Sequence, residues 1–249
     1  MGILYVVGIG GGNRAGMTQA AYDALVQADT IVGYTTYTDL IAPLFPQKEC
    51  YATGMLKETE RCRIALDMAQ AGKTIALVCS GDAGVYGMAS LVYELSEQST
   101  WQDVAVEVIA GVTAAQGGAA VLGAPLAHDF CVISLSDLLT PQPVIEKRLQ
   151  SAAQGDFCIA LYNPRSKRRP DSLRRACTLL LQTLPAHTVC GWVRNIGRDG
   201  EEAHVCTLSD LADAPLDMFC TAFIGNSTTR LVINRGTKKM ITPRGYDLR

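Results

Sequence analysis

Runs of apolar residues recur along the chain, and each ends in a short loop of small or amide residues. The runs at 6–9, 76–79 and 106–109 lead into glycine-containing loops, and those at 159–161 and 222–224 lead into Tyr-Asn-Pro-Arg and Gly-Asn-Ser. Continuous apolar runs are typical of strands buried on both faces, and ligands of open α/β sheets bind beyond the carboxyl ends of the strands. The pattern therefore predicts one large site that is built mostly from backbone.

Segments with helical spacing alternate with strands in the first part of the chain. Helices are expected over 17–28, 58–71 and 85–97, and strands over 30–32, 74–79 and 104–109, in addition to the first run. This alternation predicts a mostly parallel sheet with right-handed crossovers.

The second part has a different character. A small-residue helix at 114–122 leads to Gly123-Ala124-Pro125, a crossing point between two halves. Further on, strands are expected over 130–135, 157–161, 188–193, 202–207 and 219–224, and helices over 144–153 and 172–183. The turn-rich loop at 195–201 is typical of a hairpin, so the sheet is expected to be mixed. We therefore expect a protein of the α/β class with two tandem domains, residues 1–112 and 113–249.

Composition limits the classes of function. The 22 Lys and Arg against 24 Asp and Glu give a formal net charge of −2, which argues against a general electrostatic binder of nucleic acid. The nine cysteines lie mostly in apolar runs and include no C-x-x-C pair, so reduced thiols are favoured over disulfides or zinc. Because the sequence has no apolar run of about 18 residues and its first residues do not resemble a secretory signal, we expect a cytoplasmic protein with no membrane span. The histidines are not clustered, so we expect no metal site.

Two motifs that suggest nucleotide binding are weak. The segment Gly10 to Ala15 fits a loose G-x-G-x-x-[GA] pattern, but the second strand ends without the acidic residue of a Rossmann site. Gly72-Lys73-Thr74 precedes a strand, whereas a phosphate loop follows one, so the end of a helix is the better interpretation. The first loop is therefore expected to hold another ligand.

One concentrated basic region, Arg165 to Arg169, directly follows a strand. Such a run is usually a solvated face, which is our interpretation of Arg168 and Arg169. An arginine at the carboxyl end of a strand can bind a carboxylate through two hydrogen bonds. Arg165 and Lys167 are therefore candidates for contact with an anionic substrate.

Taken together, these loops resemble those of the tetrapyrrole methylase family, whose members use S-adenosylmethionine. The resemblance rests on Met17-Thr18 after the first loop, Ser80-Gly81-Asp82, and the segment Gly111 to Ala114. One departure is that the family's Gly-x-Gly-Pro-Gly-Asp loop ends here in Asn13. The branch that methylates C17 of precorrin-3B in cobalamin biosynthesis is similar over residues 80–89, 123–126, 128–131, 134–141, 161–167 and 242–246.

The resemblance implies a homodimer of two-domain chains that binds S-adenosylmethionine in the cleft between the domains. It also implies methylation with contraction of the macrocycle, on precorrin-3B or its cobalt-containing counterpart. Cofactor contacts are carried over to Gly81, Asp82, Val85, Thr113, Ala114, Ser136, Asn163, Gly225 and Asn226. Substrate contacts are expected at Gly11, Gly12, Asn13, Arg14, Arg165 and Lys167. Candidate acids and bases for the ring contraction are Ser136, Asp137, Tyr86, Asp82 and His128, and Asp137 has the alternative role of a helix cap.

Two alternatives stay open at this stage: another corrin or uroporphyrinogen C-methyltransferase, and a protein that binds a tetrapyrrole without turnover. Methyl transfer from a sulfonium needs alignment and exclusion of water more than a strong nucleophile, which fits the lack of a catalytic triad motif.

We further expect Asp82→Ala to weaken cofactor binding and leave the fold intact, because the substitution removes a loop acceptor and no core volume.

Overall fold

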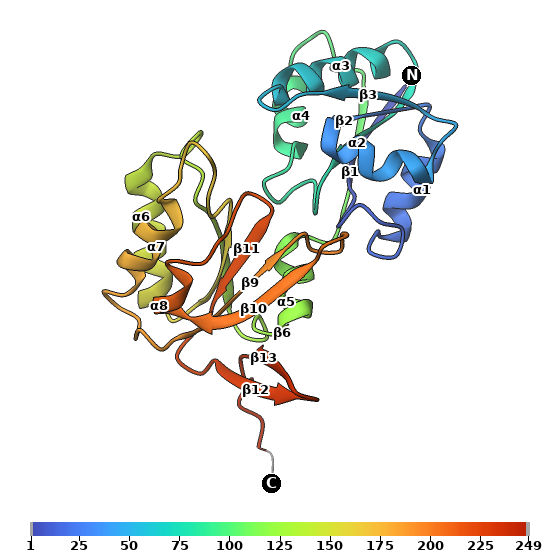
Figure 1. Ribbon diagram of the computed structural model, residues 1–249. Helices are drawn as coiled ribbons and strands as arrows, with labels where there is room; N and C mark the ends of the chain where they lie inside the picture. The colour runs from blue at the N-terminus through green and yellow to red at the C-terminus, as the bar shows by residue number, and fades with distance from the viewer. Residues whose placement is uncertain (1, 248–249) are drawn as a thin grey trace. The chain divides into compact units, whose positions relative to one another are not determined.

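The computed structural model describes residues 2–247, which form two compact units, one ending at Ala114 and the other beginning at Ala115 (Figure 1). Each unit contains a five-stranded sheet covered by helices, and the second unit has a further small sheet. No helix in the described part of the chain has both the length and the apolar composition needed to cross a membrane.

The first unit contains a five-stranded sheet in the order β3-β2-β4-β1-β5, in which every neighbouring pair is parallel. The strands are β1 (Ile3–Gly8), β2 (Thr30–Tyr34), β3 (Glu49–Thr53), β4 (Thr74–Cys79) and β5 (Ala105–Ile109). The helices are α1 (Gln19–Gln27), α2 (Thr35–Ile41), the 3₁₀ turn η1 (Ala42–Leu44), α3 (Glu58–Gln70) and α4 (Ala89–Ser96). The expectation of a parallel sheet is confirmed.

Helices cover both faces of this sheet, because successive apolar side chains of its strands point to opposite faces. Leu4 and Val6 pack with α3 and α4 on one face, whereas Val7 and Val78 pack with α1 on the other. Successive side chains of a strand point to opposite faces, so a continuous apolar run supplies both layers. The apolar runs in the sequence reflect this burial on both sides.

The first unit differs from the prediction in two places. The helix expected over 85–97 begins only at Ala89, because the preceding residues form turns in which Tyr86 adopts a left-handed φ of 54°. Strand β3 and helix α2 were not expected. Four of the five residues of β3 are exposed at the edge of the sheet, so this strand lacks the apolar signature of its buried neighbours.

The second unit contains a mixed five-stranded sheet in the order β10-β9-β11-β8-β7 and a small sheet in the order β12-β13-β6. The strands are β6 (Gly123–Ala124), β7 (Phe130–Ser134), β8 (Cys158–Tyr162), β9 (Val189–Arg194), β10 (Glu202–Thr207), β11 (Cys220–Ile224), β12 (Arg230–Asn234) and β13 (Thr237–Ile241). The helices are α5 (Ala114–Leu122), α6 (Gln142–Gln154), α7 (Ser172–Leu180) and α8 (Leu208–Leu211). The expectations of a mixed sheet and of the β9-β10 hairpin are confirmed.

Strand direction in the larger sheet matters for the position of the loops. Strands β7 and β8 are parallel, whereas β11 is antiparallel to both β8 and β9. Strand β9 therefore runs in the same direction as β7 and β8. We call the edge where these three strands end the carboxyl edge of the second unit, and the opposite edge its amino edge.

Helix α5 covers one face of this sheet, and α6, α7 and α8 cover the other. On the α5 side, Ala115 and Leu122 pack with Phe223, while Ile145 and Leu173 belong to the core of the opposite side. The β12-β13 hairpin was not expected, although its turn, Arg235-Gly236, has the left-handed φ values of 48° and 77° that suit a two-residue hairpin.

Candidate functional site

Three loops meet at the carboxyl edge of the first unit, where its parallel strands end. They follow β1, β4 and β5, which are neighbours because β1 lies between the other two. The loops after β1 and β4 are joined through their backbones, since the N–H groups of Gly10 and Gly81 each donate to the other residue's carbonyl oxygen at 2.9 Å. Ligands of open α/β sheets bind at this edge, so these loops form the candidate site of the first unit.

The Asp82 carboxylate ties the loops together. Its Oδ1 accepts the N–H groups of Gly84 at 2.8 Å and Val85 at 3.1 Å, and its Oδ2 accepts the N–H of Gly111 at 2.9 Å. The first two contacts close the turn after β4, and the third reaches the loop after β5. Asp82 is therefore a positioning residue for the loops, and its carboxylate is engaged by the protein itself.

Glycine is required where the loops cross. A Cβ on Gly111 would lie 2.1 Å from the carbonyl oxygen of Gly81 and 2.5 Å from that of Gly8. A Cβ on Gly8 would lie 2.7 Å from the backbone nitrogen of Gly111. These are backbone contacts that no rotamer change can relieve, so the absent side chains are what allow the loops to approach each other.

The loop after β1 is shaped by Asn13. The Asn13 Oδ1 accepts the N–H of Gly16 at 2.6 Å, a contact that an aspartate oxygen in this position would make as well. Arg14, a predicted substrate residue, donates to Gln19 Oε1 at 2.6 Å and lies 4.1 Å from the Tyr22 ring centre. Its guanidinium therefore interacts with α1 and is already partnered. Gly11 and Gly12 lie in the same loop, and Gly12 is buried.

Other predicted cofactor residues of the first unit lie close to these loops. A Cβ on Gly81 would lie 3.6 Å from both Thr113 Cα and the backbone nitrogen of Ala114, so the loop after β4 is next to the start of α5. Val85 is half-buried in the turn that Asp82 closes, and Tyr86 beside it is exposed. The structure thus brings together Gly81, Asp82, Val85, Thr113 and Ala114.

In the second unit, the ends of β7 and β8 are joined by a serine. The Ser134 hydroxyl oxygen accepts the side-chain amide of Asn163 at 3.0 Å and the N–H of Ser136 at 3.2 Å. Asn163 has a left-handed φ of 53°, and the Tyr162 hydroxyl accepts the N–H of Ala115 at 2.7 Å. Ser136 and Asn163, both predicted cofactor residues, therefore lie side by side at the carboxyl edge.

Arg169 stabilises the loop that follows β7. Its side chain is only 16% exposed, its Nη1 donates to the Leu135 carbonyl oxygen at 2.7 Å, and its Nε lies 3.5 Å from Asp137 Oδ1. The interpretation of Arg169 as a solvated residue was therefore wrong, whereas Arg168 is exposed as expected. Asp137 pairs with this arginine and does not cap α6, whose N-cap residue is Pro141.

The basic residues of the loop after β8 differ in their exposure to solvent. Ser166 and Arg169 form a tight turn through N–H···O contacts of 3.3 and 3.0 Å, which leaves Lys167 and Arg168 exposed. Arg165 is half-buried, and among the described residues its buried Nε has no hydrogen-bond partner. An N–H group left unpaired in this way favours binding of an external acceptor.

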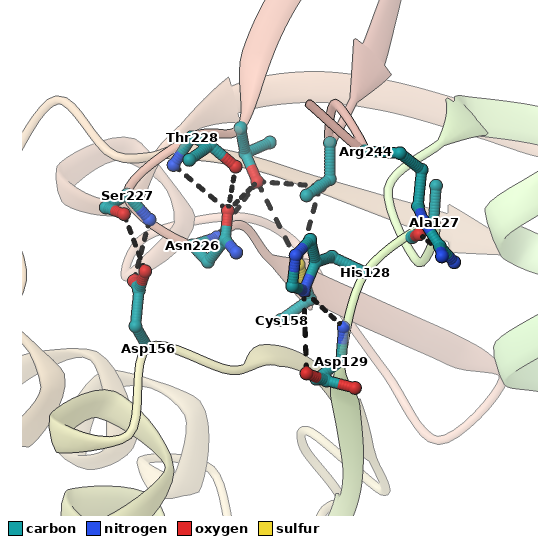
Figure 2. A network of polar contacts seen from close by, with 11 residues as sticks. Ala127, His128, Asp129, Asp156, Cys158, Asn226, Ser227, Thr228 and Arg244 are labelled. Carbon is teal, nitrogen blue, oxygen red and sulfur yellow. Dashed lines mark hydrogen bonds and ion pairs between the residues drawn. The ribbon is translucent and has the colours of Figure 1, made fainter. Parts of the chain in front are cut away.

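Gly225, Asn226 and His128 lie at the amino edge of the second unit. Strand β11 is antiparallel to β8, so the loop after it lies beside the start of β8, where the Ser227 N–H and hydroxyl donate to Asp156 at 2.8 and 2.6 Å. His128 precedes β7, and its Nδ1 accepts the Asp129 N–H at 2.9 Å (Figure 2).

The expectation that these residues join Ser136 and Asn163 in one site needs correction. A strand of five residues spans about 16 Å, which is too far for one catalytic group to reach from the amino edge to the carboxyl edge. The Asn226 Oδ1 is also occupied, because it accepts the Thr228 N–H at 3.1 Å and the hydroxyls of Thr228 and Thr229 at 2.9 and 3.1 Å. The sequence interpretation failed because it treated every strand as if it ended at the same edge.

The loop after β9 lies at the carboxyl edge and was not among the predicted site residues. It begins at Asn195, which has a left-handed φ of 51° and whose N–H donates to the Phe219 carbonyl oxygen at 3.2 Å. Like the other loops, it begins with small and amide residues, Asn-Ile-Gly, directly after a buried strand, and this pattern could have marked it as part of the site. The sequence pattern predicted only the turn of a hairpin for this segment.

The first-unit loops combine backbone amides with the Asp82 carboxylate, whereas the carboxyl edge of the second unit carries Asp137 and the cations of the loop after β8. Cys79 ends β4 next to the first-unit loops, and burial raises the pKa of its thiol to about 11, so it is not a thiolate at neutral pH. Among the described residues, no group of three or more His, Cys, Asp or Glu side chains could hold a metal ion. Backbone groups held in fixed loops suit the binding and alignment of reactants.

Comparisons with known proteins find similarity over nearly the whole chain. The model of the family described as Tetrapyrrole (Corrin/Porphyrin) Methylases matches residues 3–212. A probable cobalt-factor III C(17)-methyltransferase of Salmonella typhimurium is 50% identical over 246 residues, covering 99% of this chain and 100% of that protein. A precorrin-3B C(17)-methyltransferase of Sinorhizobium sp is 40% identical over 248 residues, covering 98% and 97%.

Among solved structures, the methyltransferase CobJ superposes with a TM-score of 0.90 at 36% identity, over 98% of this chain and 100% of that one. The similarity thus extends through both units, and the resemblance inferred from the loops is confirmed. This chain belongs to the tetrapyrrole (corrin/porphyrin) methylases.

Proposed function

We propose that this protein transfers a methyl group from S-adenosylmethionine to C17 of precorrin-3B or its cobalt-containing counterpart, with contraction of the macrocycle, in cobalamin biosynthesis. The observation that carries the proposal is the match over nearly the whole chain to relatives named as C(17)-methyltransferases, one for cobalt-factor III and one for precorrin-3B. Both names share the position of methylation and differ in the metal content of the substrate.

The loops of the first unit fit a small, polar methyl donor. Gly81, whose own N–H and carbonyl are paired with Gly10, places the loop after β4 next to Thr113 and Ala114, and the close backbone approach of Gly8 and Gly111 keeps the loops compact. When bound, the cofactor supplies an activated methyl group on a sulfonium. The role of the protein is then to align the acceptor carbon and exclude water, with Asp82 acting indirectly through the loops that it fixes.

The second unit contributes polar groups at its carboxyl edge. Ser136 and Asn163 are proposed to bind the cofactor, and Asp137 beside Arg169 is the proposed acid or base for ring contraction. Gly225, Asn226 and His128 are left out of the proposed site, because they lie at the amino edge.

The direct test is turnover with methyl-labelled S-adenosylmethionine and each of two substrates, metal-free precorrin-3B and cobalt-factor III. Label at C17 of a ring-contracted product supports the proposal, and the better substrate shows whether cobalt is required. Label at another carbon would instead favour a different corrin or uroporphyrinogen C-methyltransferase. Tight tetrapyrrole binding without cofactor binding would favour a non-catalytic carrier.

Arg165→Ala is expected to raise the KM for the tetrapyrrole roughly ten- to a hundredfold, because a hydrogen bond to a charged group contributes about 1.5–3 kcal/mol. The affinity for S-adenosylhomocysteine, measured by calorimetry, is expected to be unchanged. Arg148→Ala removes an exposed arginine from α6 and is the matched control. Equal KM values for the two variants would contradict the carboxylate-binding role of Arg165.

We also propose that the protein is a homodimer and acts in the cytoplasm, as the resemblance to the family implies. Sedimentation equilibrium of the purified protein tests the first statement, and fractionation of the producing cells tests the second.

A further inference from the structure

Exposed apolar side chains gather in two places at the carboxyl edge of the second unit. Leu138 and Leu139, in the loop after β7, are 60% and 97% exposed. Met218 and Phe219, which lead into β11, are 43% and 44% exposed. Full burial of one such side chain contributes about 1.5–3 kcal/mol, so the four together are a substantial apolar surface facing solvent.

The order of the strands places a basic loop between these two apolar pairs. Strand β8 lies between β7 and β11, and because β11 is antiparallel its first residues are at the same edge as the last residues of β7 and β8. The loop after β8 carries the half-buried Arg165 and the exposed Lys167. Across this edge, the cationic loop after β8 therefore lies between the leucine pair after β7 and the Met218-Phe219 pair before β11.

Both apolar pairs are on anchored segments. Arg169 bonds the Leu135 carbonyl oxygen and pairs with Asp137, directly before the two leucines. On the other side, the Phe219 carbonyl oxygen accepts the Asn195 N–H at 3.2 Å, and the Phe219 N–H donates to Asp217 Oδ1 at 2.9 Å. Exposed side chains on fixed backbone lose less conformational entropy when a ligand covers them.

We propose that Leu138, Leu139, Met218 and Phe219 form the contact surface for the flat apolar face of the tetrapyrrole, with Arg165 placed to bind one of its carboxylate arms. A tetrapyrrole combines an extended apolar plane with anionic arms, and this edge is complementary to it because it combines apolar groups with cations. The inference rests on the proposed function and adds to it the residues that select a macrocycle over a smaller anion. Arg169 is then a positioning residue for the leucine pair.

The test is titration of the full chain with uroporphyrin III, followed by its absorbance and the quenching of protein fluorescence. The double variant Leu138→Ser/Leu139→Ser and the single variant Phe219→Ser are each expected to weaken binding tenfold or more. Calorimetric affinity for S-adenosylhomocysteine and the melting temperature of the leucine variant are expected to match the wild type. Ile233→Ser is the control, since Ile233 is 64% exposed on the β12-β13 hairpin, away from this edge.

Each outcome has a distinct meaning. Unchanged uroporphyrin affinity in both variants overturns the inference and leaves the proposed function standing. A lower sedimentation coefficient in the leucine variant also overturns it, because the leucines would then contact a second copy of the chain. A wild-type protein that binds the tetrapyrrole through these residues but methylates neither substrate contradicts the proposed function alone, and one that binds no tetrapyrrole contradicts both.

Discussion

Gly111→Ala is expected to lower the free energy of unfolding by about 3 kcal/mol or more and to abolish measurable binding of S-adenosylhomocysteine. The new Cβ would lie 2.1 Å from one backbone oxygen and 2.5 Å from another, so the loops after β1, β4 and β5 would have to separate. Overpacking against side chains costs about 1–3 kcal/mol, and backbone atoms on two sides have less freedom to adjust.

Gly54→Ala is the matched control for this experiment. It makes the same chemical change in the same unit, at a position where an added Cβ would have no neighbour within 4 Å. Urea denaturation and calorimetry on the two variants separate steric conflict at the loops from a general effect of replacing glycine. A Gly111→Ala protein with wild-type stability and affinity would refute the close approach of the three loops.

Asp82→Ala is expected to reduce the free energy of unfolding by about 3 kcal/mol, because three backbone N–H groups lose their acceptor at about 1 kcal/mol each. The affinity for S-adenosylhomocysteine is expected to fall at least tenfold, since the turn after β4 and the loop after β5 are no longer joined. This replaces the expectation from the sequence that the fold stays intact. From the sequence, Asp82 is expected to be an acceptor within one loop, whereas its carboxylate accepts N–H groups from the loop after β4 and from the loop after β5.

Two comparisons make the Asp82 experiment specific. Asp82→Asn keeps an oxygen acceptor but turns an amide NH₂ toward part of the same cluster, so an intermediate loss is expected. Asp103→Ala removes an exposed carboxylate from the same unit and is expected to change neither quantity. If Asp82→Ala unfolds like Asp103→Ala but binds the cofactor weakly, Asp82 contacts the ligand directly and the positioning role is refuted.

Much of the fold could be read from local patterns. The helix predicted over 114–122 was observed as α5 with those bounds, and the hairpin of β9 and β10 was recognised from its turn-rich loop. Strand β3 was missed because an exposed edge strand carries little apolar signal. The late start of α4 was missed because the turns before Ala89, in which Tyr86 adopts a left-handed φ of 54°, leave no trace in the apolar spacing of the sequence.

The sequence by itself determined the α/β class, the two-unit organisation, the loops rich in small and amide residues, and the family to which they belong. These features depend on neighbours along the chain and on motifs, which a single sequence contains. Only the tertiary structure decided which loops share an edge. An apolar run reads the same whether its strand is parallel or antiparallel to its neighbours, so strand direction is set by pairing between distant segments. For that reason Ser136 and Asn163 lie together at the carboxyl edge, whereas Gly225, Asn226 and His128 lie at the opposite edge. Arg169 proved to be a largely buried residue that holds the β7 loop.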